Sequence, residues 1–436
     1  MRITELTIRN FRGIKAATIE FPFVSKRGRT TVLLGVNGAG KTAVLDCLAI
    51  LLSQMAARVR SGPGVLRQYS ELDVRRGQVV TTGHVTVKEF GQAWSWSRSK
   101  RSASALRRHG GGVSIRGGTR VPPDGLRGLA NALRDAATDD PENPFPMPPP
   151  FAVYYPTNRA VLDIPLRIRQ RHPLDQLSAY DHALTGASAN FRVFFEWFRN
   201  REDIENEERV SDPGHRDRQL EAVRRAVKAM PVGLADLRVR RSPLRMVVTK
   251  GNEELRIDQL SDGEKCLFAL TGDLARRLAI AAGPNNPPLD TPAVVLIDEV
   301  DLHLHPQWQR QVVPCLEAAF PNCQFIVSTM SPLVVSQVQP EYVRILRREG
   351  DRTEVITPER TFGLDANRVL EEVMDGQKRP PKVAKRIEKL FDALAEGGDG
   401  EDKALRLLDA LRREIGDDPE LAEAEAMLDL RRRLRK

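Results

Sequence analysis

The sequence predicts an α/β fold, with a buried β-sheet, helices packed around it and a phosphate-binding loop at the end of one strand. Three observations predict it. A glycine-rich segment, residues 35–42, lies between an apolar strand and an apolar helix. The all-apolar run of residues 293–297 is typical of a strand buried on both faces, and two acids follow it. Between these segments, apolar residues recur at helical spacing.

Alternating or wholly apolar runs predict the strands, and apolar residues three and four positions apart predict the helices. Strands are expected at residues 2–9, 17–21, 30–34, 79–90, 151–157, 235–258, 293–297 and 324–328. Helices are expected from Lys41 onward, over 187–230 and over 263–280, and the chain after about residue 376 should be helical. Four phenylalanines at 191, 194, 195 and 198 share one helix face, which we expect to be core.

Composition bounds the class of protein. The 436 residues carry a formal net charge of +9, which favours polyanions such as nucleic acid but equally fits a generally basic protein. None of the four cysteines forms a CxxC pair, so no zinc site is predicted. The N-terminus does not resemble a signal peptide, and no apolar run approaches the roughly 20 residues of a membrane span. We therefore expect a soluble, cytoplasmic protein without membrane contact.

A basic, acid-free segment over residues 90–123 is expected to be an exposed loop or hairpin insertion. It is either a DNA contact or a solvated loop, and the sequence leaves both open. Its seven bases are Arg98, Lys100, Arg101, Arg107, Arg108, Arg116 and Arg120.

The segment Gly35-Val36-Asn37-Gly38-Ala39-Gly40-Lys41-Thr42 fits the P-loop pattern, in which backbone N–H groups surround phosphate oxygens. Lys41 can reach the β- and γ-phosphates, and the Thr42 hydroxyl can hold Mg²⁺. The following helix points its positive end at the anion. The predicted nucleotide-binding residues here are Asn37, Gly38, Ala39, Gly40, Lys41, Thr42 and Ala43.

Asp298 and Glu299 end the buried run Val294–Ile297, which is the Walker B arrangement. We expect Asp298 to hold Mg²⁺ together with Thr42, and Glu299 to act as the general base toward water. The predicted catalytic residues are Glu299, Asp298 and Lys41, and the predicted cofactors are ATP and Mg²⁺.

The run Leu260-Ser261-Asp262-Gly263-Glu264-Lys265 opens a helix and resembles the signature of ABC ATPases in its RecF/SMC form. The resemblance implies that Ser261, Asp262, Gly263 and Glu264 contact the nucleotide of the other protomer in a homodimer or higher oligomer. An ordinary capping box, in which Ser261 pairs with Glu264, explains the same residues, and both interpretations can hold.

Further positions extend this resemblance. Arg12, in Asn10-Phe11-Arg12, matches a segment whose arginine lies near the nucleotide in the family, and Asp301 matches the D-loop. Met330 departs from the pattern, because it occupies the place of the switch histidine and cannot donate a hydrogen bond to a γ-phosphate. The glutamine loop cannot be placed, and Gln78 and Gln92 remain candidates.

The resemblance implies a fold class: an ABC-type P-loop NTPase head, RecF/SMC-like, with a helical lobe inserted between the Walker A and signature segments. We divide the chain into ATPase lobe I (1–95), a basic and proline-rich insertion (96–150), a mainly helical lobe (151–234), ATPase lobe II (235–375) and a C-terminal helical region (376–436). The apolar stripes of the last part, at Leu390, Leu394, Leu405, Leu408 and Leu411, either pack within the protein or dock a partner.

Segments around Tyr154–Val161 and Phe194–Phe198 resemble the RecF/SMC-type ATPases of bacterial defence, a group that includes the overcoming-lysogenization-defect family and the Septu ATPase subunit PtuA. This implies an ATPase that regulates a nucleic-acid-directed activity together with a separate HNH nuclease and DNA or RNA; no nuclease site is expected in this chain. Two alternatives stay open: a RecF-like repair ATPase that binds duplex or gapped DNA, and a scaffold that binds ATP without hydrolysing it.

Overall fold

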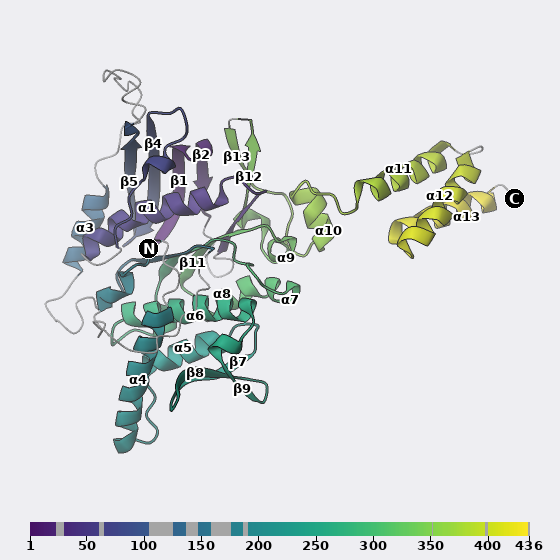
Figure 1. The fold of residues 1–436 in the computed structure, drawn as a ribbon. Coiled ribbons are helices and arrows are strands. Elements are labelled where there is room, and N and C mark those ends of the chain that lie inside the picture. Colours follow the sequence, from purple (N-terminus) through teal and green to yellow (C-terminus); the bar gives the residue numbers. More distant parts are fainter. Residues whose placement is uncertain are drawn as a thin grey trace. The chain divides into compact units, whose positions relative to one another are not determined.

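The computed structural model describes residues 1–22, 30–60, 65–103, 125–136, 147–157, 176–185, 191–350, 352–396 and 400–434. These residues form two compact units, 1–366 and 367–436 (Figure 1). The larger unit holds all three β-sheets of the described residues, and the described part of the smaller unit is helical.

A six-stranded sheet forms the centre of the larger unit, in the order β13-β12-β3-β11-β10-β6. All of its pairings are parallel except that of β13 with β12. Every residue of β3, β6, β10 and β11 is buried, as expected for strands covered on both faces. The strands are β3 (Thr30–Leu34), β6 (Phe151–Tyr155), β10 (Ala293–Ile297), β11 (Cys323–Thr329), β12 (Val343–Glu349) and β13 (Arg352–Ile356). The sequence patterns missed β12 and β13.

A four-stranded antiparallel sheet, β2-β1-β4-β5, lies against helix α1 (Lys41–Val59), as Figure 1 shows. The buried apolar residues of the sheet include Leu6, Ile8, Val85 and Val87. Its strands are β1 (Arg2–Phe11), β2 (Ile14–Glu20), β4 (Val80–Glu89) and β5 (Gln92–Arg101). Because α1 also contacts β6, β10 and β11, it lies between the two sheets. Its length and apolarity would suffice to cross a membrane, contrary to our expectation that no segment comes close; 78% of the apolar window is buried inside the protein.

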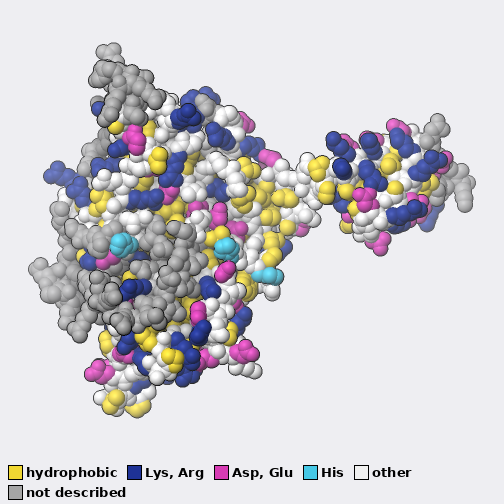
Figure 2. Space-filling model, viewed as in Figure 1, with side chains coloured by type: hydrophobic (Ala, Val, Ile, Leu, Met, Phe, Trp, Pro, Cys, Tyr) yellow, Lys and Arg dark blue, Asp and Glu magenta, His cyan; other side chains and the backbone are white. Residues whose placement is uncertain are grey.

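Strand β5 lies in the segment expected to be a basic loop or hairpin insertion. It pairs with β4 along its whole length, so the boundary proposed at residue 95 falls inside a strand. Along this edge strand serines alternate with Trp94, Trp96, Arg98 and Lys100, so two bases continue the face of the buried Trp96 and conceal its apolar pattern. Of the seven predicted bases, Arg107, Arg108, Arg116 and Arg120 lie outside the described residues. On the face drawn in Figure 2, basic side chains are interspersed with acidic ones.

The part between the P-loop and the signature contributes helices and a small sheet to the larger unit. Helix α4 (Phe191–Ser211) places its phenylalanines against Phe268 of helix α6 (Asp262–Ala281), so this face is core as expected. Helices α3 (Gly125–Asp135) and α5 (Arg218–Lys228) and the antiparallel sheet β7 (Leu234–Arg241), β8 (Leu244–Lys250) and β9 (Glu253–Arg256) also belong to this part, which supplies β4, β5 and β6 to the two larger sheets. Short helices after β10 are α7 (Pro306–Gln309), α8 (Val312–Ala319), α9 (Pro332–Val335) and α10 (Ala366–Arg368).

The smaller unit is built on three helices: α11 (Pro381–Glu396), α12 (Gly400–Ile415) and α13 (Pro419–Leu434). Their apolar stripes pack on one another, with Leu390, Leu394, Leu408 and Leu411 buried and Leu405 packed at the edge. The stripes therefore form the core of this unit, which was one of our two alternatives.

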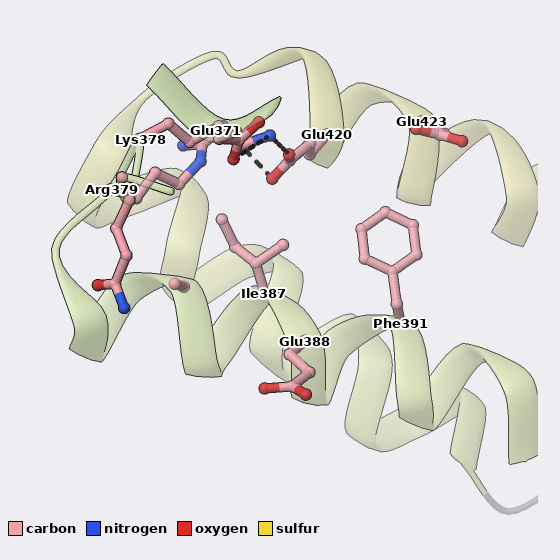
Figure 3. Close-up of a pocket in the computed structure, with 11 residues that line it drawn as sticks. Glu371, Lys378, Arg379, Ile387, Glu388, Phe391, Glu420 and Glu423 are labelled. Atoms are coloured by element: carbon pink, nitrogen blue, oxygen red, sulfur yellow. Dashed lines mark ion pairs between the residues drawn. The ribbon is translucent and has the colours of Figure 1, made fainter. Parts of the chain in front are cut away.

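A polar-rimmed pocket opens in the smaller unit (Figure 3), with Ile387 and Phe391 at its apolar floor. Its volume is about 470 Å³. The Lys378 ammonium is paired with Glu371 and Glu420, so its charge is neutralised within the pocket.

Candidate nucleotide-binding site

The loop between β3 and α1 has the backbone geometry that the glycine pattern predicts. Gly35 has a φ of 154°, and a Cβ there would lie 2.6 Å from the carbonyl oxygen of Leu346 on β12. Gly40 has a φ of 108° immediately before α1 begins. Side chains at these positions would be strained or would clash, so glycine is needed for the loop to turn. Asn37 and Gly38 are exposed at its tip, whereas Ala39 and Ala43 are buried beneath it.

Lys41 is buried at the start of α1, and its side chain lies along the loop. The ammonium donates to the carbonyl oxygens of Gly35 at 2.6 Å and Val36 at 3.3 Å. Burial lowers the pKa of Lys41, although the carboxylates of Asp298, Glu299 and Asp301 act in the opposite direction. The predicted lysine and these three acids therefore share one electrostatic site.

Thr42, at the start of α1, and Asp298, which directly follows β10, are in direct contact. The Thr42 hydroxyl donates to Asp298 Oδ2 at 2.8 Å, and Ser328 Oγ donates to Asp298 Oδ1. Asp298 itself is 2% exposed. The P-loop and the Walker B strand, far apart in the chain, thus bring together the two residues expected to hold a metal ion.

These oxygen donors fit Mg²⁺, which prefers hard oxygen ligands and is bound in nucleotide sites by few protein groups together with phosphates. The described residues contain no group of three or more His, Cys, Asp or Glu able to hold a metal ion by themselves. A hydroxyl and one carboxylate 2.8 Å apart beside a phosphate loop match that sparse protein contribution.

Glu299 follows Asp298 in a left-handed backbone conformation, with a φ of 48°. Such a conformation costs a non-glycine residue about 1–3 kcal/mol and persists where the surroundings impose it. Here the N–H of Glu299 donates to Ser328 Oγ at 2.8 Å, and that of Val300 donates to the Ser328 carbonyl at 2.9 Å. Ser328 at the end of β11 therefore shapes the turn that carries both acids.

The D-loop and the switch position are tied together. Thr329 Oγ1 donates to Asp301 Oδ1 and accepts from the N–H of Ser331 at 2.9 Å. Met330 lies in the chain between Thr329 and Ser331. It is 37% exposed, in contrast to the fully buried Thr329. A side chain at position 330 therefore emerges next to the acids that follow β10.

Arg12 is held by carboxylates beside α1. Its guanidinium pairs with Asp46 and with Asp73, the latter at 2.8 Å, and Arg67 also pairs with Asp46, at 2.6 Å. Burial works against the charge of Arg12, but the two carboxylates outweigh it and raise its pKa. Asp46 lies one helical turn after Thr42, so this network borders the P-loop helix.

The signature segment begins α6 with a complete capping box. The N–H and hydroxyl of Ser261 both donate to Glu264 Oε2 at 2.8 Å, and Lys250 pairs with Glu264. A Cβ at Gly263 would lie 2.5 Å from the carbonyl oxygen of His303, so this glycine lets α6 begin against the D-loop segment. Ser261 and Asp262 are exposed, and Glu264 is buried. The capping interpretation is thus realised within the chain, while the exposed Ser261 remains open to a partner.

Three residues of this region were missed by the sequence patterns: Asp46, Ser328 and Thr329. The last two stand directly before Met330 at the end of the predicted strand, and a strand-end hydroxyl beside a Walker B strand is a usable signal. No pattern marks Asp46, because a buried acid inside an apolar helix is recognisable only through its arginine partners.

Two family models match the chain. One, described as "AAA domain", matches residues 5–108, and one described as "AAA domain, putative AbiEii toxin, Type IV TA system" matches residues 160–336. "Retron Ec83 probable ATPase" from Escherichia coli is 26% identical, with 100% of this chain and 87% of that protein covered. The chain has the fold of a P-loop NTPase. "Retron Vc95 probable ATPase" from Vibrio cholerae serotype O1 biovar El Tor is 28% identical over 82% of this chain and 76% of that protein.

The chain also resembles "Septu protein PtuA" of Bacillus mycoides (strain KBAB4), at 35% identity but over only 24% of this chain and 14% of that protein. The expected likeness to PtuA is therefore confirmed for a part of the chain, whereas the retron ATPases, which the sequence patterns did not suggest, match most or all of it. Among solved structures, "SMC head domain from Thermotoga maritima" aligns with a TM-score of 0.42 at 16% identity, covering 83% of this chain and 100% of that one. The fold assignment rests on the sheet order and the motifs.

Proposed function

We propose that this ATPase binds ATP with Mg²⁺ at the P-loop and hydrolyses it in a site completed by Ser261 of a second copy. The contact between Thr42 and Asp298 carries the proposal, because it joins the P-loop to the Walker B strand through the atoms a nucleotide-bound metal requires. The full-length match to a retron protein named a probable ATPase supports the same activity.

The residues have separable roles in this proposal. Lys41 and the backbone N–H groups of the loop bind the phosphates, and the positive end of α1 adds to the attraction. Thr42 and Asp298 would hold Mg²⁺, which neutralises charge that develops on the phosphate oxygens. Glu299 accepts a proton from the attacking water, and Ser328 keeps Glu299 in position through its backbone.

The change Glu299→Gln tests the composite site. It removes the base but keeps the size and the backbone turn, so ATP should accumulate unhydrolysed and hold two copies together. We expect phosphate release to fall at least about 100-fold and sedimentation velocity to show a dimer or larger oligomer only with ATP and Mg²⁺. Glu359→Gln, at an exposed glutamate, is the control and should leave turnover unchanged. If the Glu299 variant stays monomeric with ATP at every protein concentration, the composite site is wrong.

Turnover should be low in the natural chain because Met330 stands at the switch position. A thioether cannot donate a hydrogen bond to a γ-phosphate, whereas the N–H of an imidazole can. Met330→His should therefore raise steady-state phosphate release, by about tenfold or more for one hydrogen bond to a charged group. Met330→Leu keeps the apolar character and should not raise it. Equal rates in all three proteins would contradict this role for position 330.

We propose further that the ATPase serves anti-phage defence, as the retron and Septu names of its relatives suggest, and regulates a separate HNH nuclease acting on DNA or RNA. Affinity purification of the chain expressed with its neighbouring genes should recover the nuclease. Salt-sensitive binding of the chain alone to gapped DNA, without a nuclease partner, would instead favour the RecF-like repair function. Full function of the Glu299→Gln protein in phage challenge would favour a scaffold that only binds ATP.

A further inference from the structure

β6 ends in two tyrosines whose side chains leave opposite faces of the central sheet, as successive residues of a strand do. On one face, the Tyr154 ring lies 5.6 Å from the guanidinium of Arg67, which pairs with Asp46 of the P-loop helix. On the other face, the Tyr155 hydroxyl donates to Asp273 Oδ2 of the signature helix α6 at 3.0 Å. One dipeptide thus contacts the charge networks of both helices that contribute to the proposed site.

The same dipeptide is tied to the Walker B acid. β6 and β10 are parallel with Tyr155 opposite Ile297, and the N–H of Asp298 donates to the Tyr155 carbonyl oxygen at 2.9 Å. Tyr155 is therefore bonded through its backbone to the residue expected to hold Mg²⁺ and through its hydroxyl to α6.

Asp273 is the centre of a buried ionic cluster. Its carboxylate pairs with Arg276 and Arg277, each at 2.7 Å, and all three side chains are at most 7% exposed. Arg277 also donates to the carbonyl oxygens of Ala179 at 2.6 Å and Asp181 at 2.9 Å. Burying ions is expensive, and packed apolar residues would hold a helix in place equally well. The two ion pairs lie within α6 and hold the Asp273 carboxylate in place, and the hydrogen bond from Tyr155 to that carboxylate then fixes the rotation and depth of α6 relative to β6.

The orientation at Asp273 determines the orientation of Ser261. Both belong to one continuous helix without a proline, with Ser261 as its N-cap. Their separation is about 18 Å along the axis at 1.5 Å per residue. A rotation of α6 at Asp273 would therefore move Ser261, which is the group offered to a second copy.

We propose that Tyr155 is a positioning residue that, through Asp273, fixes the signature helix to the end of the strand beside Asp298. The inference rests on the proposed function, because it concerns how one copy presents Ser261 to the nucleotide of another. Loss of the hydroxyl leaves the Asp273–arginine pairs in place but frees α6 to shift. Association of two copies must then fix the position of α6, and this weakens association. Binding of nucleotide to the P-loop of a single copy does not require α6 to be fixed.

The test is Tyr155→Phe in the Glu299→Gln protein, with Tyr180→Phe as the matched control. Tyr180 is equally buried, and its hydroxyl donates to the Pro150 carbonyl at 2.6 Å rather than to α6. Two quantities are measured: the dissociation constant of the ATP-dependent dimer by sedimentation velocity, and the affinity for a fluorescent ATP analogue below the concentration of dimer formation. Tyr155→Phe should weaken the dimer at least about tenfold, because each copy loses one hydrogen bond to a charged group, and leave nucleotide affinity within about twofold.

Tyr180→Phe should change neither quantity. The positioning role is overturned if both variants associate like their parent, if nucleotide affinity falls in parallel with association, or if Tyr155→Phe only lowers the melting temperature. A parent that does not associate with ATP overturns the composite site itself, and the role of Tyr155 with it. These outcomes separate the two hypotheses.

Discussion

Lys41→Ala should weaken ATP binding at least about 100-fold and abolish measurable phosphate release. The lysine is the one cation that projects from the P-loop helix into the loop, and it is surrounded by carbonyl oxygens and by the field of three acids. Removing it leaves negative charge facing the phosphates, and truncating one partner of a buried charge pair costs about 2–5 kcal/mol. Fluorescent ATP binding and phosphate release measure the two effects.

Lys88→Ala is the charge-matched control, because Lys88 is exposed on β4 and removes the same net charge. It should bind ATP as the natural chain does. Circular dichroism of Lys41→Ala should retain the helix content, since alanine is a strong helix former. If Lys41→Ala bound ATP within about threefold of the natural chain, the nucleotide would have to bind somewhere other than the P-loop.

The glycine loop and the Walker B strand could be predicted because both depend on local constraints. Gly35 and Gly40 have backbone angles that other residues rarely adopt, and β10 is apolar because both of its faces are covered. Each of these constraints is met by a few consecutive residues, so it can be recognised from a short stretch of sequence. The contact of Thr42 with Asp298 follows from these motifs once they are joined in one sheet.

Other parts of the fold cannot be recognised from a short stretch of sequence. β5 is an edge strand on which Arg98 and Lys100 continue the face of the buried Trp96 and serines occupy the other face, so its pattern resembles that of a basic loop. The pairs of Arg12 with Asp46 and of Tyr155 with Asp273 join residues far apart in the chain, and nothing near either residue specifies its partner. The signature is intermediate: its capping box is local, but the need for Gly263 arises from the carbonyl of His303.

The second large effect is expected on stability, for Asp273→Asn. Burial by itself raises the pKa of Asp273, and the guanidiniums of Arg277 and Arg276 outweigh it, so the pKa lies well below the ordinary value of 3.8. The aspartate is therefore ionised in the folded protein and balances two buried cations. Asparagine keeps the shape but leaves both arginines without a counter-charge, and breaking a buried pair in this way costs about 3–5 kcal/mol.

At about 2.1 cal/mol/K per residue, a loss of this size lowers the melting temperature of the unit 1–366 by about 4–6 °C. Asp262→Asn is the control on the same helix: the Asp262 side chain is 81% exposed, and the melting temperature of this variant should differ little from that of the natural chain.

The contribution of Asp273 to stability should also depend on pH, in a direction that its pKa determines. Because the folded-state pKa is depressed, the contribution of Asp273 is complete above the unfolded-state value near 4 and declines as the pH falls toward the folded-state pKa. The natural chain should therefore lose more stability than Asp273→Asn between pH 5 and pH 3, about the unfolded-state value. Identical melting temperatures for the two chains at pH 7 would show that the cluster does not hold α6 in the way that both this prediction and the role of Tyr155 require.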